Sequence, residues 1–267
     1  MAVSLGMDLT LSNYRSDNVE VSDDLVLWRY LDFPKFLDLI TTSTLKMPRA
    51  SSMEDGYEGV LGPAATTANL EAWKKRGEPS YLRNVSWNQE LGETFFWRER
   101  TYISCWNAFP GENAGLWRIY GDDKGVVIKS TWGALKNSLT KKSDCVSEVF
   151  YGAVKYRDFD NDPYFTDSYT DQYFSKRHEF IHENEFRLVA QDNSRKHNYE
   201  EPDASDLPRF ATLDCNLNVL IDEVVVSPRL GGWVQDGVKT VSEKFGGRWN
   251  VRHSNLYDPP EQSSTRF

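Results

Sequence analysis

The densest group of ionisable side chains in the sequence lies between residues 176 and 190. In the first half of this segment, His178 and His182 stand four residues apart with Glu179 between them, which is the spacing of a zinc-hydrolase helix. On a helix both imidazoles face one way and can share a zinc ion, while Glu179 acts as general base. The third ligand would come from a polar loop, from His197, Glu200 or Glu201.

The second half of the same segment favours a different chemistry, because it alternates as a β-strand. Glu183, Glu185 and Arg187 would share one face of such a strand, with Phe186 on the opposite face in the core. The three charges are either a functional row or an ordinary solvent-facing row on an edge strand. We expect a helix that ends near His182 and a strand that follows it, which places the zinc motif across a helix end.

Length and composition limit the classes of protein to which the chain can belong. With 267 residues, of which 39% are hydrophobic and 13% aromatic, the chain is long and apolar enough for a packed core. A formal net charge of −9 argues against broad, sequence-independent binding to nucleic acid. Cys105, Cys145 and Cys215 have no disulfide spacing, so we expect free thiols in a reducing compartment. No run of 18 apolar residues marks a membrane span, and we expect a soluble, cytoplasmic protein.

Arg29 is the sharpest single signal among the elements that would position these charges. It lies in the apolar run 24–31, which is typical of a strand buried on both faces. A guanidinium in such surroundings requires an anionic partner. That partner is either a bound ligand or a structural salt bridge to Glu183 or Glu185, and a ligand site can rest on such a bridge.

The remaining elements mix helices and strands without strict alternation, which predicts the α+β class. We expect a helix after Asp32 with Pro34 in its first turn, and a helix that begins near Tyr173. Further helices are expected at 64–76, 113–121 and 233–245, and strands at 45–47, 95–106, 125–131, 146–156, 220–228 and 249–254. We place one domain at 23–256, with a variable insertion at about 51–93, a flexible arm at 1–22 and a disordered tail at 257–267.

A series of short blocks gives the chain a family likeness. The blocks are Trp-Arg-Tyr-Leu-Asp-Phe (28–33), Glu-Asp-Gly-Tyr-Glu-Gly (54–59), Ser-Cys-Trp-Asn (104–107), Leu-Trp-Arg-Ile-Tyr-Gly (116–121), Gly-Val-Val-Ile-Lys-Ser-Thr (125–131), Tyr-Gly-Ala-Val-Lys-Tyr (151–156), the segment 176–187 with Lys-Arg at its start and Phe-Ile-His-Glu-Asn-Glu-Phe-Arg at its end, and Val-Val-Ser-Pro (225–228). In this order they resemble an uncharacterised bacterial family, the domain-of-unknown-function 2971 family. The resemblance names no activity.

A second likeness exists at the level of pattern. An early strand with a basic residue, a middle aromatic strand–helix unit and a late Glu-x-Glu strand follow in an order that is similar to ADP-ribosyltransferase folds. This resemblance implies a split, mostly antiparallel sheet flanked by helices. It also implies NAD as substrate, with ADP-ribose transfer or NAD glycohydrolysis as the reaction, no bound metal, and a role as toxin or defence effector.

Within that resemblance the charged residues take on roles. Arg29 would hold a phosphate or ribose of NAD, and Arg suits bidentate phosphate contact better than Lys does. Breaking the bond between nicotinamide and ribose passes through an oxocarbenium-like sugar, which Glu185 would stabilise. Glu183 would orient the acceptor or take its proton.

Aromatic and hydroxyl side chains would complete the site. Tyr30 and Trp117 would contact the nucleotide, although core packing is the commoner explanation for any one ring. Tyr120 ends a short helix beside a Gly turn, so we expect its hydroxyl to face a cleft and join the catalytic group. Ser104 would support the Glu pair by hydrogen bonding.

The leading hypothesis is therefore an ADP-ribosyltransferase-like enzyme. Its expected partners are NAD or a related nucleotide and an unidentified macromolecular acceptor, without a membrane. The first alternative is a zinc-dependent hydrolase that uses His178, Glu179 and His182. The second is a non-catalytic binding domain in which all these charges are structural.

Overall fold

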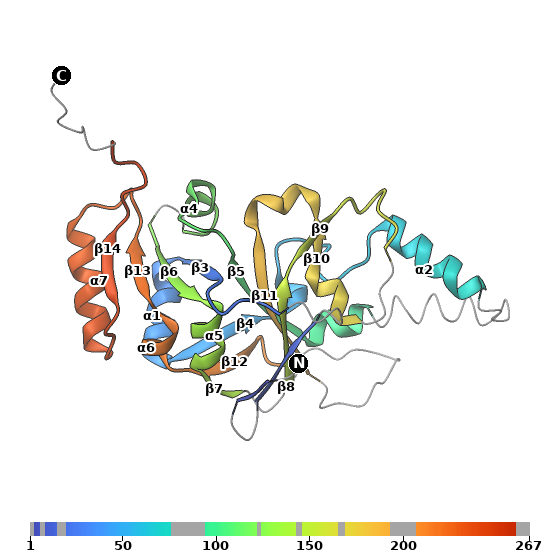
Figure 1. The fold of residues 1–267 in the computed structure, drawn as a ribbon, viewed down its shortest axis with the longest axis horizontal. Coiled ribbons are helices and arrows are strands. Elements are labelled where there is room, and N and C mark those ends of the chain that lie inside the picture. The colour runs from blue at the N-terminus through green and yellow to red at the C-terminus, as the bar shows by residue number, and fades with distance from the viewer. Residues whose placement is uncertain are drawn as a thin grey trace.

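The computed structural model describes residues 3–5, 9–14, 20–75, 94–121, 124–142, 146–164, 169–192 and 207–259. Within them, nine strands form one sheet in the order β1-β2-β8-β11-β5-β3-β6-β13-β14 (Figure 1). The strands are β1 (Val3–Leu5), β2 (Leu9–Asn13), β3 (Val26–Leu31), β5 (Thr101–Asn107), β6 (Val126–Thr131), β8 (Val146–Ala153), β11 (Glu185–Asp192), β13 (Glu223–Val226) and β14 (Asn250–His253). All neighbours are antiparallel except β2–β8 and β13–β14, which confirms the expected α+β class with a mostly antiparallel sheet.

Helices flank this sheet, and two smaller sheets accompany it. The helices are α1 (Phe33–Thr42), α2 (Pro63–Lys75), α4 (Ala114–Tyr120), α5 (Trp132–Ser138), α6 (Leu217–Leu220) and α7 (Trp233–Lys244), with a further helical stretch at 94–100. The small antiparallel sheet has the order β4-β12-β7, from β4 (Thr44–Pro48), β12 (Phe210–Cys215) and β7 (Leu139–Lys142). A parallel pair joins β9 (Lys155–Arg157) to β10 (Ser175–Arg177).

Strand β3 is buried on both faces, as its apolar run predicts. Leu27 belongs to the main hydrophobic core, whereas Trp28 belongs to a second cluster on the opposite face. Alternation along the strand places Arg29 on the face of Leu27. β3 pairs with β6 along its whole length, but it pairs with β5 only at Trp28↔Asn107. The hydrogen-bonded ladder between β3 and β5 is therefore limited to one register pair, and Arg29 follows directly after it.

Helix α1 starts directly after β3 for the reasons that the sequence indicates. The Asp32 side chain accepts a hydrogen bond from the Lys35 amide (2.8 Å), and Pro34 lies in the first turn. The helix buries Phe36 against the core and ends at Ser43, whose φ of 53° is left-handed. These signals fix the first turns of α1 close to the end of β3.

The segment 176–190 is neither α-helical nor uniformly extended. It contains β10, the 3-10 helix η3 (His178–Glu183) and the start of β11, and another 3-10 helix, η2 (Tyr169–Phe174), precedes it. The expected α-helix from near Tyr173 is therefore wrong. Asn184 has a left-handed φ of 42° and donates its amide to the Ile181 carbonyl, which ends η3. Strand β11 begins at Glu185, within two residues of the predicted boundary.

The expected flexible arm is wrong for residues 9–13. These residues form β2, which pairs in parallel with β8, and Leu9 and Leu11 are buried in the main core. The alternation of apolar and polar residues at 9–13 is too short to predict a strand, and β2 is stabilised by its pairing with β8. Other parts of the predicted termini and insertion, at 1–2, 6–8, 15–19, 76–93 and 260–267, lie outside the described residues.

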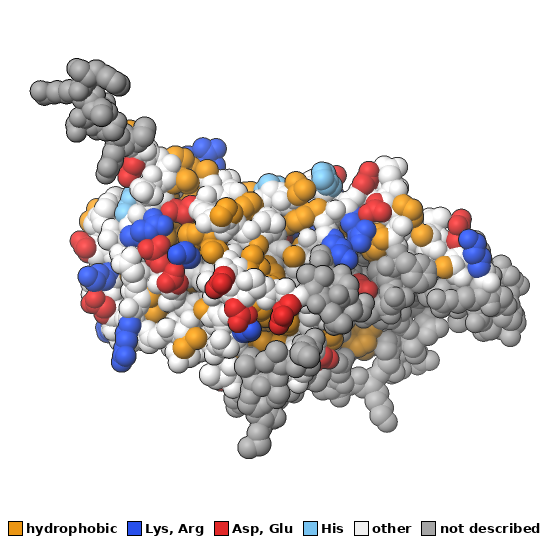
Figure 2. All heavy atoms as spheres, in the orientation of Figure 1, with side chains coloured by type: hydrophobic (Ala, Val, Ile, Leu, Met, Phe, Trp, Pro, Cys, Tyr) orange, Lys and Arg blue, Asp and Glu red, His pale blue; other side chains and the backbone are white. Residues whose placement is uncertain are grey.

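The surface carries mixed charge. On the face shown in Figure 2, acidic side chains lie among the basic ones, and hydrophobic side chains gather near the centre of the described part. Within the described ranges, no helix combines the length and the apolar character that a membrane crossing requires.

Candidate functional site

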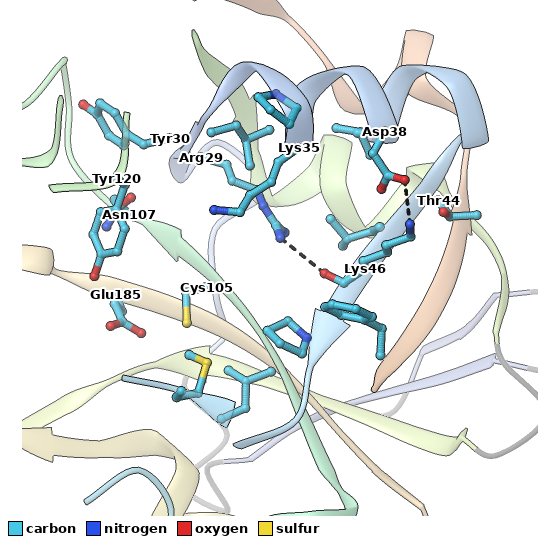
Figure 3. Close-up of a pocket in the computed structure, with 18 of the residues that line it drawn as sticks. Arg29, Tyr30, Lys35, Asp38, Thr44, Lys46, Cys105, Asn107, Tyr120 and Glu185 are labelled. Atoms are coloured by element: carbon cyan, nitrogen blue, oxygen red, sulfur yellow. Dashed lines mark hydrogen bonds and ion pairs between the residues drawn. The ribbon is translucent and has the colours of Figure 1, made fainter. Parts of the chain in front are cut away.

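A cavity of about 580 Å³ lies between α1, β4 and the strands β3, β5 and β11 (Figure 3). Its volume falls within the range of roughly 300–1,000 Å³ that is typical of small-molecule sites. Its charged lining consists of Arg29, Lys35, Asp38, Lys46, Lys176 and Glu185, and the Tyr120 side chain lies among them. In Figure 3, Arg29 and Lys35 extend into the cavity from one side, and Tyr120 and Glu185 lie on the other. The Arg29 guanidinium and the Glu185 carboxylate thus lie on opposite sides of one cavity, and the Asp38 carboxylate lies with Lys46 on the side of Arg29.

Arg29 is held by neutral acceptors. Its Nη1 donates to Ser104 Oγ (2.5 Å) and its Nη2 to the Lys46 carbonyl (3.4 Å). The guanidinium also lies 5.5 Å from the centre of the Trp106 ring, within cation–π range. Ser104 therefore supports the arginine of β3, whereas sequence analysis expected it to support the Glu pair.

The guanidinium also has no counter-ion among the residues that the structure describes. Among the described residues, no carboxylate lies within ion-pair distance of Arg29, so one of the two alternatives for its partner, a salt bridge to Glu183 or Glu185, is not formed. The other cations lining the cavity are all paired: Lys35 with Asp32 (2.8 Å), Lys46 with Asp38 (2.6 Å), and Lys176 with Glu183 and Glu185. Burial lowers the pKa of Arg29 to about 10, so the side chain stays charged at neutral pH. A guanidinium that stays charged and has no carboxylate partner among the described residues is complementary to an anionic ligand.

Glu185 lies at the centre of a buried ionic network. Its Oε1 accepts from Lys176 Nζ (2.6 Å) and its Oε2 from Arg187 Nε (2.5 Å). Lys176 also donates to Glu183, and both Nη groups of Arg187 donate to Glu58. All five side chains are buried. Buried charges are costly unless they have oppositely charged partners. The network therefore fixes the position of the first residues of β11.

The two carboxylates of the Glu-x-Glu motif have different proton affinities. Burial by itself would raise the pKa of Glu185, but Arg187 and Lys176 hold it well below its ordinary value. Burial, and then the nearby Glu185 carboxylate, raise the pKa of Glu183 to about 7. Tyr120 donates its hydroxyl to Glu183 Oε1 (2.6 Å). Near neutral pH, Glu185 is therefore ionised while Glu183 titrates, which is the separation that acid–base sites use.

The predicted nucleotide-binding aromatics lie in different places. Tyr30 lines the cavity, and its hydroxyl accepts from the Asn113 amide (2.7 Å). Trp117 is fully buried in the second cluster, with its indole N–H donated to Glu112 (3.1 Å). Because Trp117 does not line the cavity, the expectation that its ring contacts a ligand has no support. Its position on the apolar face of α4 accounts for its burial.

The two histidines of the zinc motif do not share a helix face. In the 3-10 helix η3, residues four apart point about 120° away from each other. His178 and His182 are exposed, and His182 Nδ1 lies 3.1 Å from the Glu179 carbonyl. In the part of the chain that the structure describes, no three or more His, Cys, Asp or Glu side chains form a group that could hold a metal ion. The suggested loop ligands, His197, Glu200 and Glu201, lie outside it.

The sequence did not identify Lys176 as the ion-pair partner of the two glutamates, or Glu58 as the partner of Arg187. Lys176 belongs to a basic pair of a kind that usually marks a solvated face, and Glu58 belongs to an acidic turn. Both are buried because β10 and the turn pack beside β11. The one local signal near Glu58 is Gly59, whose φ is +70° and where an added Cβ would lie 2.2 Å from the Tyr173 ring.

A model of the family described as "Protein of unknown function (DUF2971)" matches residues 116–188. The matched range contains α4 with Tyr120, and it continues through η3 to the first residues of β11 with both glutamates. It confirms the resemblance to this family over those residues. Neither the curated proteins nor the solved structures contain a significant match to the chain.

The network makes a prediction about stability. Arg187→Met is expected to lower the free energy of unfolding by about 3–5 kcal/mol, because Glu58 and Glu185 would stay buried without their shared cation. Lys129→Met is the control, since it removes the more exposed pair with Asp222 (2.9 Å) and should cost less than about 1 kcal/mol. Urea denaturation measures both. Equal, small losses would contradict a buried ionic network.

Proposed function

We propose that this protein is an ADP-ribosyltransferase-like enzyme that uses NAD as its substrate. In the proposed reaction, the bond between the nicotinamide nitrogen and ribose C1′ breaks, and nicotinamide leaves with the bonding electrons. The oxygen of water or of an acceptor hydroxyl then bonds to C1′ and loses its proton to a base. One observation carries the proposal: Arg29, which has no carboxylate partner among the described residues, lines the same cavity as Glu185.

The order of the strands supports the ADP-ribosyltransferase-like assignment. β11, β5 and β3 are consecutive in the large sheet, and they carry Glu185, Ser104 and Arg29 respectively. A ligand in the cavity can therefore contact a carboxylate at one edge and a guanidinium two strands away. This arrangement suits a substrate with a reactive ribose at one end and phosphates nearby.

Arg29 is suited to the phosphates of NAD. Its planar guanidinium can donate two parallel hydrogen bonds to a phosphate. An arriving anion would supply the counter-ion that the buried charge lacks, and it would raise the pKa of Arg29 again. Lys35 lies on the same side of the cavity, but its ion pair with Asp32 (2.8 Å) offsets its charge, so Arg29 is the main anion-binding group proposed there.

Glu185 is suited to the developing positive charge on the ribose. The buried network contains three carboxylates and two cations, so it carries one net negative charge when Glu183 is ionised. Charges that are already fixed in a poorly hydrated site stabilise a cationic transition state without reorganisation. The bonds from Lys176 and Arg187 hold the Glu185 carboxylate in one orientation.

Tyr120 and Glu183 are suited to removing the proton. The Tyr120 side chain lines the cavity and donates to Glu183, which lies behind it. A water molecule or acceptor hydroxyl beside Tyr120 can pass a proton to the phenol oxygen as the phenol proton moves to Glu183. A base with a pKa near the working pH is efficient in this role.

The other two hypotheses explain less. A zinc hydrolase requires both histidines on one face, and the 3-10 geometry of η3 gives it no support. A non-catalytic binding domain accounts for the buried network but not for the unbalanced charge of Arg29. Consumption of NAD would harm a cell, and this is the basis for proposing a role as toxin or defence effector.

Loss of the Glu185 charge is expected to abolish most turnover. Glu185→Gln keeps the shape of the side chain but removes the charge, and kcat for nicotinamide release from NAD should fall by about 10²–10³-fold. The control is Glu179→Gln, a neighbouring exposed glutamate, which should keep full activity. Full NAD turnover by Glu185→Gln would contradict the proposal, and loss of activity in Glu179→Gln alone would favour the zinc hydrolase.

The raised pKa of Glu183, about 7, predicts the pH dependence. A carboxyl group is protonated below its pKa, so the relay can accept a proton only above it. We expect kcat/KM to rise as the pH increases through about 7 and then to level off. Glu183→Gln should be slower and should lack this rise. An unchanged rise in the Glu183→Gln profile would exclude Glu183 as the proton acceptor.

A further inference from the structure

The cavity continues beyond Arg29, away from Glu185. In Figure 3, Thr44 and Lys46 lie on the far side of Arg29 from Glu185 and Tyr120. This part of the cavity is formed by the outer face of the small sheet. Leu45 and Met47 of β4 are buried in the core, and the residues that alternate with them, Thr44, Lys46 and Pro48, all line the cavity.

The outer face of the small sheet carries an exposed aromatic ring. Phe210 is the register partner of Pro48 in the β4–β12 pair, and both line the cavity. The Phe210 side chain is 46% exposed, although Ala211 and Leu213 of the same strand are buried. The Phe210 ring is therefore not packed in the core, and its exposed surface is available to a ligand in the cavity.

We propose that Lys46, Pro48 and Phe210, which we call the Phe210 shelf, bind the adenine base of NAD. This inference rests on the proposed function and names the second half of its binding site. Arg29 connects the two halves, because one of its nitrogens contacts Ser104 and the other contacts the Lys46 carbonyl. A substrate whose phosphates bind Arg29 would extend its ribose–nicotinamide end toward Glu185 and its adenosine end over the shelf.

The chemistry of the shelf fits a flat base better than an aliphatic group. An aromatic side chain stacks on any base through its π face, and Pro48 and the methylene stem of Lys46 extend the apolar surface. The ion pair between Lys46 and Asp38 (2.6 Å) lines the same part of the cavity. It presents both a donor and a carboxylate acceptor to the hydroxyls of the adenosine ribose.

The test compares two phenylalanines of nearly equal exposure. Phe210→Ala removes the shelf, and Phe245→Ala removes a ring that is 44% exposed, lies after α7 and does not line the cavity. Calorimetric titration measures binding of AMP, nicotinamide mononucleotide and NAD to each variant. We expect Phe210→Ala to weaken AMP and NAD by about tenfold or more, and to leave nicotinamide mononucleotide unchanged. Phe245→Ala should bind all three as the wild type does.

Phe210→Trp keeps a stacking surface and should retain AMP binding, which separates stacking from a folding defect in Phe210→Ala. Wild-type affinity for AMP in Phe210→Ala would overturn the shelf, as would an equal loss of nicotinamide mononucleotide binding or a wild-type protein that does not bind AMP. The proposed function fails separately, if the wild type releases no nicotinamide from NAD whatever its affinity for AMP.

Discussion

A buried ionic network at the start of β11 is the interaction on which the rest of the site depends. Lys176 and Arg187 are surrounded by three carboxylates, and all five side chains are buried. Such a network is costly unless every member is satisfied. It therefore requires the turn at 54–59, β10 and η3 to pack around β11 in one arrangement. That arrangement also sets the position of Tyr120 through its bond to Glu183.

Arg29 differs from the network residues, because its partners are neutral. As a residue it is only half-buried, whereas the network is fully buried, and its partners are a hydroxyl and a carbonyl rather than carboxylates. The short β3–β5 ladder and the position of α1 keep a cavity open beside it, so the charge is sheltered but not enclosed. Within the described residues, the contrast between the fully paired cluster and Arg29, which has no carboxylate partner there, is the physical basis for proposing an anionic substrate. The proposed catalytic charge on β11 and the proposed binding charge on β3 are separated by one strand, β5.

Much of the fold follows from local signals, because those signals are strong where they occur. The apolar run of β3, the Asp32 cap of α1 and the alternation after Asn184 each identify an element and the face of its side chains. The sequence also indicated that Arg29 needs a partner. It could not identify the partners of the Glu-x-Glu motif, since Glu58 lies far away in the chain and Lys176 reaches its glutamates only through a 3-10 turn. Trp117 shows the same limit: only the packing of α4 distinguishes a core ring from a ligand-facing one.

The most direct measurement is a crystal structure of the Glu185→Gln variant with NAD. The account predicts a phosphate or ribose oxygen of NAD within about 3 Å of the Arg29 guanidinium. It also predicts that the nicotinamide ribose lies beside residue 185 and Tyr120. NAD bound elsewhere, or an Arg29 that contacts only Ser104 and the Lys46 carbonyl in the complex, would contradict the account.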